Sequence, residues 1–211
     1  GTLWSWGYNN KGQLGNNWDA GTGNFSSPAQ IGTDTDWGTT EGKLSGGQYS
    51  CRVIKANGTL WTWGSNSYGG LGQNNRTEYS SPRQVGTDTT WASMLGGGGK
   101  STGAVKTDGT LWVWGESEYG QLGLNQGGSN AKKSSPTQVP GTTWSKVALS
   151  DYTTVASKTD GTYWTWGWSY QGALGLNQAT PTKLSSPTQI PGTWKDEVGG
   201  GNQTIYGIKL E

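Results

Sequence analysis

The stretch "TDGTLWVWGESEYGQLG", residues 107–123, contains the clearest copy of a phrase that recurs through the whole chain. The four copies of its "GT-x-W-x-WG" core begin at Gly1, Gly58, Gly109 and Gly161. Consecutive copies are therefore 57, 51 and 52 residues apart. Each core is followed by a "G-x-L-G" turn, an "SSP-x-Q" segment and a lone tryptophan: Trp37, Trp91, Trp144 and Trp194. A repeat of this period predicts an array of similar structural units.

Each repeat has the pattern of short β-strands joined by turns. In "TLWTW" the alternation places Trp61 and Trp63 on one face, which is the period of a strand. The Asn-Gly or Asp-Gly pair before this strand supplies the positive φ that a hairpin turn requires. The strand before the turn, the Ser-Ser-Pro segment and the segment around the lone tryptophan supply three more strands. We therefore expect a four-stranded antiparallel unit for each repeat.

Four such units predict an all-β fold, namely a β-propeller with four-stranded blades. A blade alone buries too little surface, so the paired tryptophans of each unit are expected to pack against the next unit. We expect a single domain over residues 1–211, with repeats that start near residues 1, 58, 109 and 161.

The two ends of the chain carry the two halves of one hairpin. The final segment "QTIYGIKLE" matches the strand before each turn, and the initial "GTLWSWG" matches the strand after it. We therefore expect the terminal strands to pair and close the ring, with Ile208 beside Leu3 or Trp4. A cut through a longer tandem array predicts the same seam, and because the chain begins with Gly1 rather than Met, this alternative stays open.

The segment "AVKTDGTLWVWGESEYGQLGLNQ", residues 104–126, followed by "SSPTQV", resembles the repeat of the regulator of chromosome condensation family. The resemblance covers all four repeats and implies propeller blades. The best-known members have seven blades, and some act as guanine-nucleotide exchange factors for a small GTPase and contact chromatin. This chain departs from them in its four repeats, its lack of histidine and its lack of a basic tail. Its bias toward Thr, Asn, Gly and Trp is similar to that of bacterial and bacteriophage members, which often occur in virion or surface proteins.

Composition argues against several classes of function. The net charge is +1, with Lys+Arg 15 and Asp+Glu 14 and no run of one sign, so we expect no nucleic-acid partner. The apolar runs are too short for membrane insertion. With His 0, the histidine-dependent nucleophilic schemes lack their central group. We therefore expect a protein that is not an enzyme and has no catalytic residues, no metal and no cofactor.

The acidic residues and the single cysteine fall in structural places. Asp108 and Asp160 belong to hairpin turns, and Asp34 and Asp88 belong to the repeated "GTDT" turn, where aspartate bonds its own backbone. The acidic pair in "WGESEYG", Glu116 and Glu118, is expected on a solvated loop. Cys51 occupies a strand position held by threonine in two other repeats, so we expect an inert core residue.

Aromatic residues outside the shared core are the candidate ligand-binding residues, because tryptophan and tyrosine on loops stack on sugars or anchor protein partners. Asp151 joins them, since it interrupts a position where other repeats have glycine runs, at 96–99 and 199–201, that are expected near the propeller axis. For Tyr68 and Tyr119, packing on their own G-x-L-G turn is the alternative. The full candidate set is Trp18, Phe25, Tyr68, Tyr119, Asp151, Trp168 and Tyr170.

These features predict a non-enzymatic structural or adhesive module on a virion or in another extracellular assembly. A rigid disc would present loops to a glycan, to a protein partner or to other subunits of the assembly. The alternative is a regulatory propeller that binds a small GTPase in the manner of an exchange factor.

Overall fold

The computed structural model describes residues 1–18, 23–40, 43–47, 49–94, 100–178, 181–200 and 204–210. Within these ranges the chain is all β, with three four-stranded antiparallel sheets and two two-stranded sheets. Two glycine runs were singled out in the sequence, at 96–99 and 199–201. Residues 96–99 and 201 lie outside the described residues.

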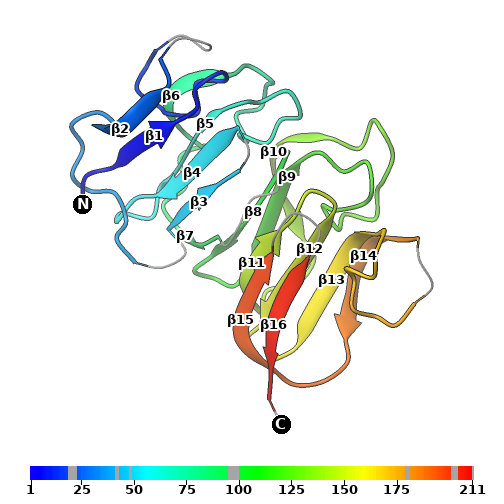
Figure 1. Ribbon diagram of the computed structural model, residues 1–211. Coiled ribbons are helices and arrows are strands. Elements are labelled where there is room, and N and C mark those ends of the chain that lie inside the picture. The colour runs from blue at the N-terminus through cyan, green and yellow to red at the C-terminus, as the bar shows by residue number, and fades with distance from the viewer. Residues whose placement is uncertain are drawn as a thin grey trace.

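The three complete sheets follow one another along the chain (Figure 1). The first contains β3 (Leu44–Gly46), β4 (Ser50–Ile54), β5 (Leu60–Gly64) and β6 (Tyr79–Gln84). The second contains β7 (Trp91–Ser93), β8 (Ser101–Lys106), β9 (Leu111–Gly115) and β10 (Lys133–Val139). The third contains β11 (Trp144–Leu149), β12 (Thr153–Lys158), β13 (Tyr163–Ser169) and β14 (Thr182–Ile190). The smaller sheets pair β1 (Trp4–Gly7) with β2 (Phe25–Gln30), and β15 (Trp194–Gly200) with β16 (Ile205–Lys209).

Each complete sheet is shared between two sequence repeats. The repeat that begins at Gly58, for example, supplies β5 and β6 to the first sheet and β7 and β8 to the second. The predicted four-stranded antiparallel unit is therefore confirmed, but its boundary is shifted by two strands from the boundary of the repeat. Because of this shift, the backbone hydrogen bonds of every complete sheet tie one repeat to the next.

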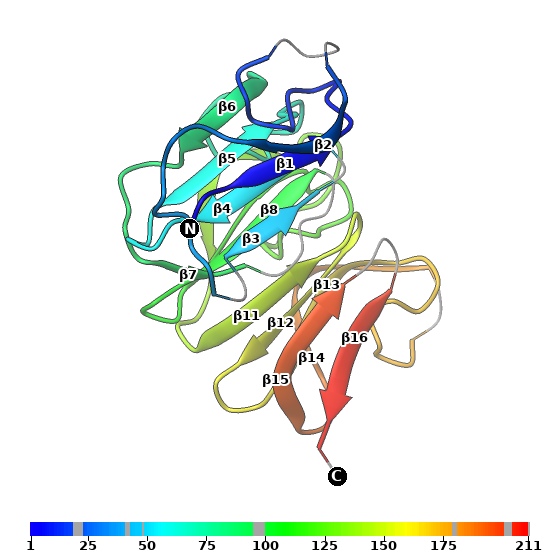
Figure 2. The ribbon, with the colours of Figure 1, turned by 60° about the vertical axis from the view of Figure 1, so that its left-hand side comes forward.

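The predicted closure of the ring by the terminal strands is wrong in this structure. β1 pairs with β2, and β16 pairs with β15, in two separate sheets. Trp4 and Ile208, which a shared sheet would cover, are 48% and 52% exposed. The two termini lie at opposite ends of the row of sheets (Figure 2). The described sheets therefore form an open row from β1–β2 to β15–β16 and do not close into a ring (Figure 2).

The predicted Asn-Gly and Asp-Gly hairpin turns are present, with φ of +79° at Gly58 and +76° at Gly109. The Asp108 carboxylate accepts hydrogen bonds from the Thr110 backbone N–H at 3.0 Å and from the Thr110 hydroxyl at 2.7 Å. The Thr110 hydroxyl oxygen in turn accepts from Nε1 of Trp112 at 2.8 Å. The turn thus satisfies the polar group of the first tryptophan of the strand. Equivalent relays join Asn57, Thr59 and Trp61, and Asp160, Thr162 and Trp164.

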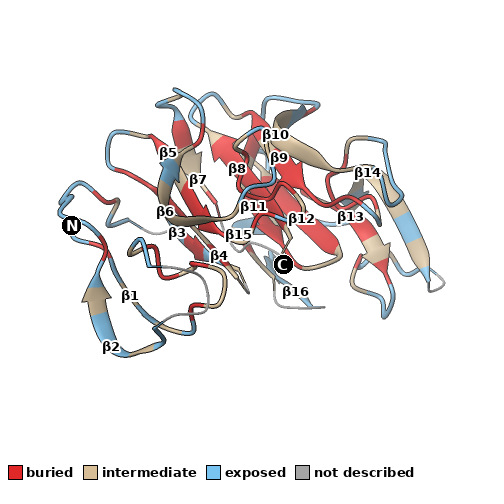
Figure 3. Cartoon of the chain, turned by 90° about the horizontal axis from the view of Figure 1, so that it is seen from above, coloured by how far each residue is buried: buried red, intermediate tan, exposed pale blue. Residues whose placement is uncertain are grey.

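The second tryptophan of the strand holds neighbouring sheets together. Trp63, Trp114 and Trp166 are fully buried. Each indole N–H donates a 2.9 Å hydrogen bond to a backbone carbonyl of the preceding repeat, at Gln13, Gly70 and Gln121 respectively. These rings therefore pack against the preceding repeat, whereas the sequence led us to expect the next one. Figure 3 shows the resulting band of buried residues, which runs through β8, β9, β12 and β13.

The G-x-L-G turn is shaped to receive this tryptophan. Gly123 has φ of +67°, and a Cβ added there would lie 2.7 Å from Nε1 of Trp166. A Cβ on Gly120 would lie 2.8 Å from Cα of Ser185, in the Ser-Ser-Pro segment of the following repeat. The backbone N–H of Asn125 donates to the Ser185 carbonyl at 2.7 Å. The glycines recur because the following repeat approaches the backbone too closely for any side chain.

Replacement of Gly123 by alanine should therefore destabilise the protein more than replacement of Gly175. Gly175 has nearly the same backbone, with φ of +65°, but its added Cβ would meet only Ile190, at 3.8 Å. Both changes carry the cost of a left-handed alanine, roughly 1–2 kcal/mol. Gly123→Ala must also displace Trp166, which should cost roughly a further 1–3 kcal/mol. Urea denaturation measures both losses, and equal losses would contradict the role assigned to this contact.

Candidate functional site

Three of the candidate aromatic residues meet at one place, between the second and third sheets. The rings of Tyr119 and Trp168 are stacked, with centroids 4.5 Å apart and planes 8° apart. Tyr170 lies 5.0 Å from Trp168, and Tyr152 lies 5.1 Å from Tyr119 and 5.5 Å from Trp168. We call the set Tyr119, Tyr152, Trp168, Tyr170 and Lys183 the aromatic junction.

Strand geometry positions each member of the aromatic junction. Tyr119 lies in the turn after β9, and Tyr152 lies between β11 and β12. β13 continues past its Trp-Gly pair, so Trp168 is still in the strand and pairs with Lys183 on β14. Nζ of Lys183 lies 4.8 Å from the Tyr119 ring and 5.7 Å from the Trp168 ring, within the range of a cation–π contact. Tyr170 is 55% exposed, so the junction presents an aromatic surface to solvent.

Among the remaining candidate residues, Asp151 lies beside the junction, whereas Trp18 and Phe25 lie in the first repeat. Asp151 directly precedes Tyr152, and its backbone carbonyl accepts from the Gln121 side chain at 3.4 Å. Trp18 and Phe25 form a separate pair in the first repeat, with ring centroids 4.6 Å apart. Tyr152 and Lys183 were missed in the sequence, because strand pairing rather than sequence spacing brings them to the other rings.

The equivalent positions between the first and second sheets hold mainly charged residues. There Nζ of Lys100 lies 4.6 Å from the Tyr68 ring, and Nζ of Lys132 lies 5.0 Å from it. Lys100 also forms a 3.3 Å ion pair with Glu116. Tyr68 and Tyr119 therefore make matching contacts with the following sheet, which indicates that both contribute to the joining of sheets.

Glu116 does not lie on a solvated loop, as the sequence led us to expect. Its side chain is only 2% exposed, whereas Glu118 two residues later is exposed. Burial raises the pKa of the Glu116 carboxyl above its ordinary value, against the opposing effect of Lys100. Because its pKa is raised, the Glu116 carboxyl contributes most to the free energy of unfolding below its pKa in the unfolded chain. This contribution is lost as the pH rises through its pKa in the folded protein.

Glu116→Gln should therefore increase the free energy of unfolding at pH 7 relative to the unsubstituted chain. The gain should shrink toward pH 4, where the carboxyl gains a proton and resembles the amide. Urea denaturation at both pH values measures the difference, and Glu118→Gln on the exposed neighbour is the matched control. If Glu116→Gln stabilised the protein less at pH 7 than at pH 4, each compared with the unsubstituted chain at the same pH, the raised pKa of Glu116 would be contradicted.

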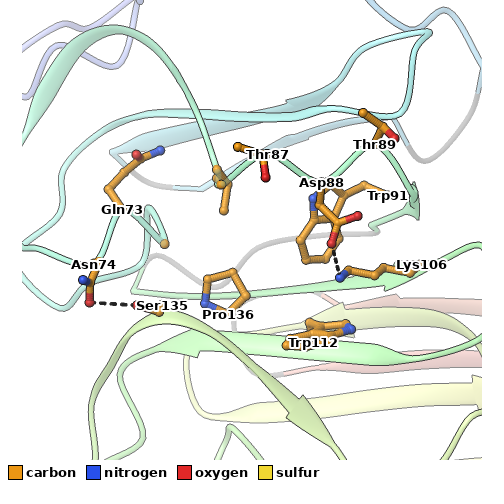
Figure 4. A pocket seen from close by; sticks show the side chains of 13 residues that line it. Gln73, Asn74, Thr87, Asp88, Thr89, Trp91, Lys106, Trp112, Ser135 and Pro136 are labelled. Atoms are coloured by element: carbon orange, nitrogen blue, oxygen red, sulfur yellow. Dashed lines mark hydrogen bonds and ion pairs between the residues drawn. The ribbon is translucent and has the colours of Figure 1, made fainter.

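A second recurring arrangement lies at the other end of the two central strands of each complete sheet, where the second strand ends in a lysine or is directly followed by one. The lysine ammonium lies between the lone tryptophan and the first tryptophan of the next strand. Nζ of Lys106 is 4.8 Å from the Trp91 ring and 4.2 Å from the Trp112 ring (Figure 4). Equivalent lysines are Lys55, between Trp37 and Trp61, and Lys158, between Trp144 and Trp164.

The aspartates of the "GTDT" turns complete this arrangement, a role that turn propensity alone did not reveal. Asp88 forms an ion pair with Lys106, drawn in Figure 4, and the hydrogen bond from Lys106 holds the Asp88 pKa below its ordinary value. Lys55 is paired with Asp34 at 2.5 Å and with Asp36 at 2.9 Å. A cavity of about 780 Å³ adjoins Lys106 and extends to Ser135 and Pro136 of the next repeat.

The described residues offer little for reactive chemistry. Burial raises the pKa of the Cys51 thiol to about 12, so the nucleophilic thiolate is scarce at neutral pH. The described ranges contain no group of three or more His, Cys, Asp or Glu side chains that could hold a metal ion. No helix long and apolar enough to cross a membrane occurs in the part of the chain that the structure describes.

Comparison with known proteins identifies the type of repeat. The model of the regulator of chromosome condensation (RCC1) repeat matches residues 57–105 and 108–157. The chain is 28% identical over 203 residues to the ultraviolet-B receptor UVR8 of Arabidopsis thaliana, which covers 92% of this chain and 45% of UVR8. It is 34% identical over 132 residues to the RCC2 homolog of Danio rerio, which covers 61% of this chain and 25% of that protein.

The same architecture occurs in solved structures. Prp20p of Saccharomyces cerevisiae, whose structure was described with its binding to Gsp1p and histones, aligns with all of this chain at a TM-score of 0.79 and 20% identity. The match covers 52% of Prp20p. The chain thus spans about half of this neighbour and less than half of UVR8. At this identity the likeness shows the fold alone, a row of propeller-type blades that is not closed into a ring.

Proposed function

Because residues 57–105 and 108–157 match the RCC1 repeat and the chain is similar to UVR8, we propose that it is a protein-binding regulatory module and that the aromatic junction is its contact surface. The repeat family supports the regulatory kind of propeller, which was the alternative in the sequence analysis. Nothing in the comparisons supports the virion, adhesive or glycan-binding role that composition suggested. The proposed role is binding, with no catalytic step assigned to the chain.

The observation that carries the proposal is the exposure of Tyr170 beside a preordered stack of rings. Tyr and Trp are enriched among the residues that dominate the energy of protein interfaces. Trp168 is held by stacking on Tyr119 and by its place in β13, so a partner would not have to order this side chain. Lys183 is exposed at the edge of the stack and would supply a charge at the rim of the interface.

Tyr170→Ala should weaken binding of a protein partner by about tenfold or more, because it removes the exposed ring of the junction. Partners retained by the immobilised chain are identified by mass spectrometry, and their affinity is then measured by calorimetry. Tyr8→Ala is the matched control, because Tyr8 is a loop tyrosine with 56% exposure, close to the 55% of Tyr170.

Equal losses in the two tyrosine variants would place the contact surface elsewhere. Binding to a glycan array that Tyr170→Ala abolishes, without any protein partner, would overturn the proposal in favour of a carbohydrate-binding role.

The narrower proposal is that the partner is a small GTPase, in line with the resemblance to exchange factors. It requires that the chain accelerate nucleotide release from a GTPase and that Tyr170→Ala reduce this acceleration. A panel of GTPases with unchanged release rates would remove the narrower proposal and leave the wider one in place.

A further inference from the structure

The three arrangements of a lysine between two tryptophans differ in one respect. Lys55 and Lys106 are each paired with an aspartate from the turn that precedes the lone tryptophan. Lys158 lies in the same position, with Nζ 4.8 Å from the Trp144 ring and 4.3 Å from the Trp164 ring. No carboxylate among the described residues forms an ion pair with Lys158.

The sequence explains why this carboxylate is missing. Between the β6 strand and Trp91 the chain reads "VGTDTT", with Asp88 in the centre. Between the end of β10 and Trp144 it reads "VPGTT", one residue shorter and without an acid. The shorter turn brings the Pro140 carbonyl to Nε1 of Trp144, at 3.2 Å. The turn therefore satisfies the tryptophan and leaves the lysine without its partner.

Asp160 does not take the place of the missing aspartate. Its carboxylate accepts hydrogen bonds from the Thr162 backbone N–H at 2.9 Å and from the Thr162 hydroxyl at 2.6 Å. Asp108 makes the same two contacts with Thr110 in the preceding repeat, and there Lys106 still has Asp88 as its own partner. The hairpin aspartate is thus common to both arrangements, and only the turn aspartate differs.

Lys158 borders a cavity of about 570 Å³ between the third sheet and its neighbour. Trp144, Trp164, Pro140 and Leu124 give this cavity apolar walls, and Lys133 adds a second cation. We refer to it as the Lys158 pocket. An ammonium between two indole rings keeps its cation–π contacts but lacks the charged hydrogen-bond acceptor that its two counterparts have.

We propose that the Lys158 pocket binds the carboxylate of a glutamate or aspartate side chain in an acidic peptide segment of a partner. The carboxylate of the peptide would lie beside Lys158 in the position that Asp88 has beside Lys106. The apolar walls would contact the methylene groups and backbone of the peptide. The site is distinct from the aromatic junction. In the pairing of β12 with β13, Ser157 lies opposite Tyr163 near the pocket, whereas Thr153 lies opposite Gly167 at the other end, near the junction.

The test measures binding of blocked tetraglutamate to the whole chain by calorimetry, with blocked tetraglutamine as the uncharged probe. Tetraglutamate should bind at one site, and Lys158→Met should weaken this binding about tenfold or more, because the charged partner is lost. Lys106→Met is the matched control and should leave the affinity unchanged, since Lys106 already has Asp88.

A gain of function tests the same argument without reliance on a loss. Asp88→Asn removes the carboxylate beside Lys106, next to a cavity of about 780 Å³, and should create a second tetraglutamate site. Equal binding of tetraglutamine, an unchanged affinity in Lys158→Met, or a single site in Asp88→Asn would each overturn the proposal. Acetate that binds as tightly as tetraglutamate would replace the peptide ligand by a free carboxylate and would also overturn it.

Discussion

The hydrogen bond from a buried indole N–H to a backbone carbonyl of the preceding repeat is the contact on which the rest of the structure depends. It occurs at Trp63, Trp114 and Trp166, always at 2.9 Å. To reach the carbonyl, the ring must lie against the turn, so the turn can carry only glycine at its closest point, as at Gly123. The Ser-Ser-Pro segment of the same repeat packs against the same turn, so a second glycine is required there, as at Gly120. One bond thus determines two glycines, the path of a strand and the contact between sheets.

Much of the fold could be predicted from the sequence because its determinants are local. The alternation of Trp61 and Trp63 and the Asn-Gly turn before them specify a hairpin without reference to the rest of the chain. Closure of the ring could not be predicted in this way, since it depends on the angle between neighbouring sheets, which no single motif encodes. The direction in which Trp63 packs was predicted wrongly, because both neighbouring repeats offer the same motif.

The candidate site was predictable only in part, for a similar reason. Trp168 stood out because it departs from the repeat, and Tyr170 because it lies in the loop after the Trp-Gly pair; the structure places both with Tyr119. Tyr152 and Lys183 come from other strands, and their approach depends on strand register rather than on sequence spacing. The burial of Glu116 and the ion pairs of Asp34 and Asp88 have the same origin: a position that looks like a solvated turn lies against the following sheet.

The contact between repeats has two different faces, a ring on one side and a turn on the other, so the array has a direction. Trp6, at the position of the fully buried Trp63, is 60% exposed, and Gly172, at the position of Gly120, has no atom within 4 Å of an added Cβ. A contact of this heterologous kind, repeated by rotation, either closes on itself or continues. Whole repeats can therefore be gained or lost during evolution without a new kind of contact, while the turns between them diverge independently.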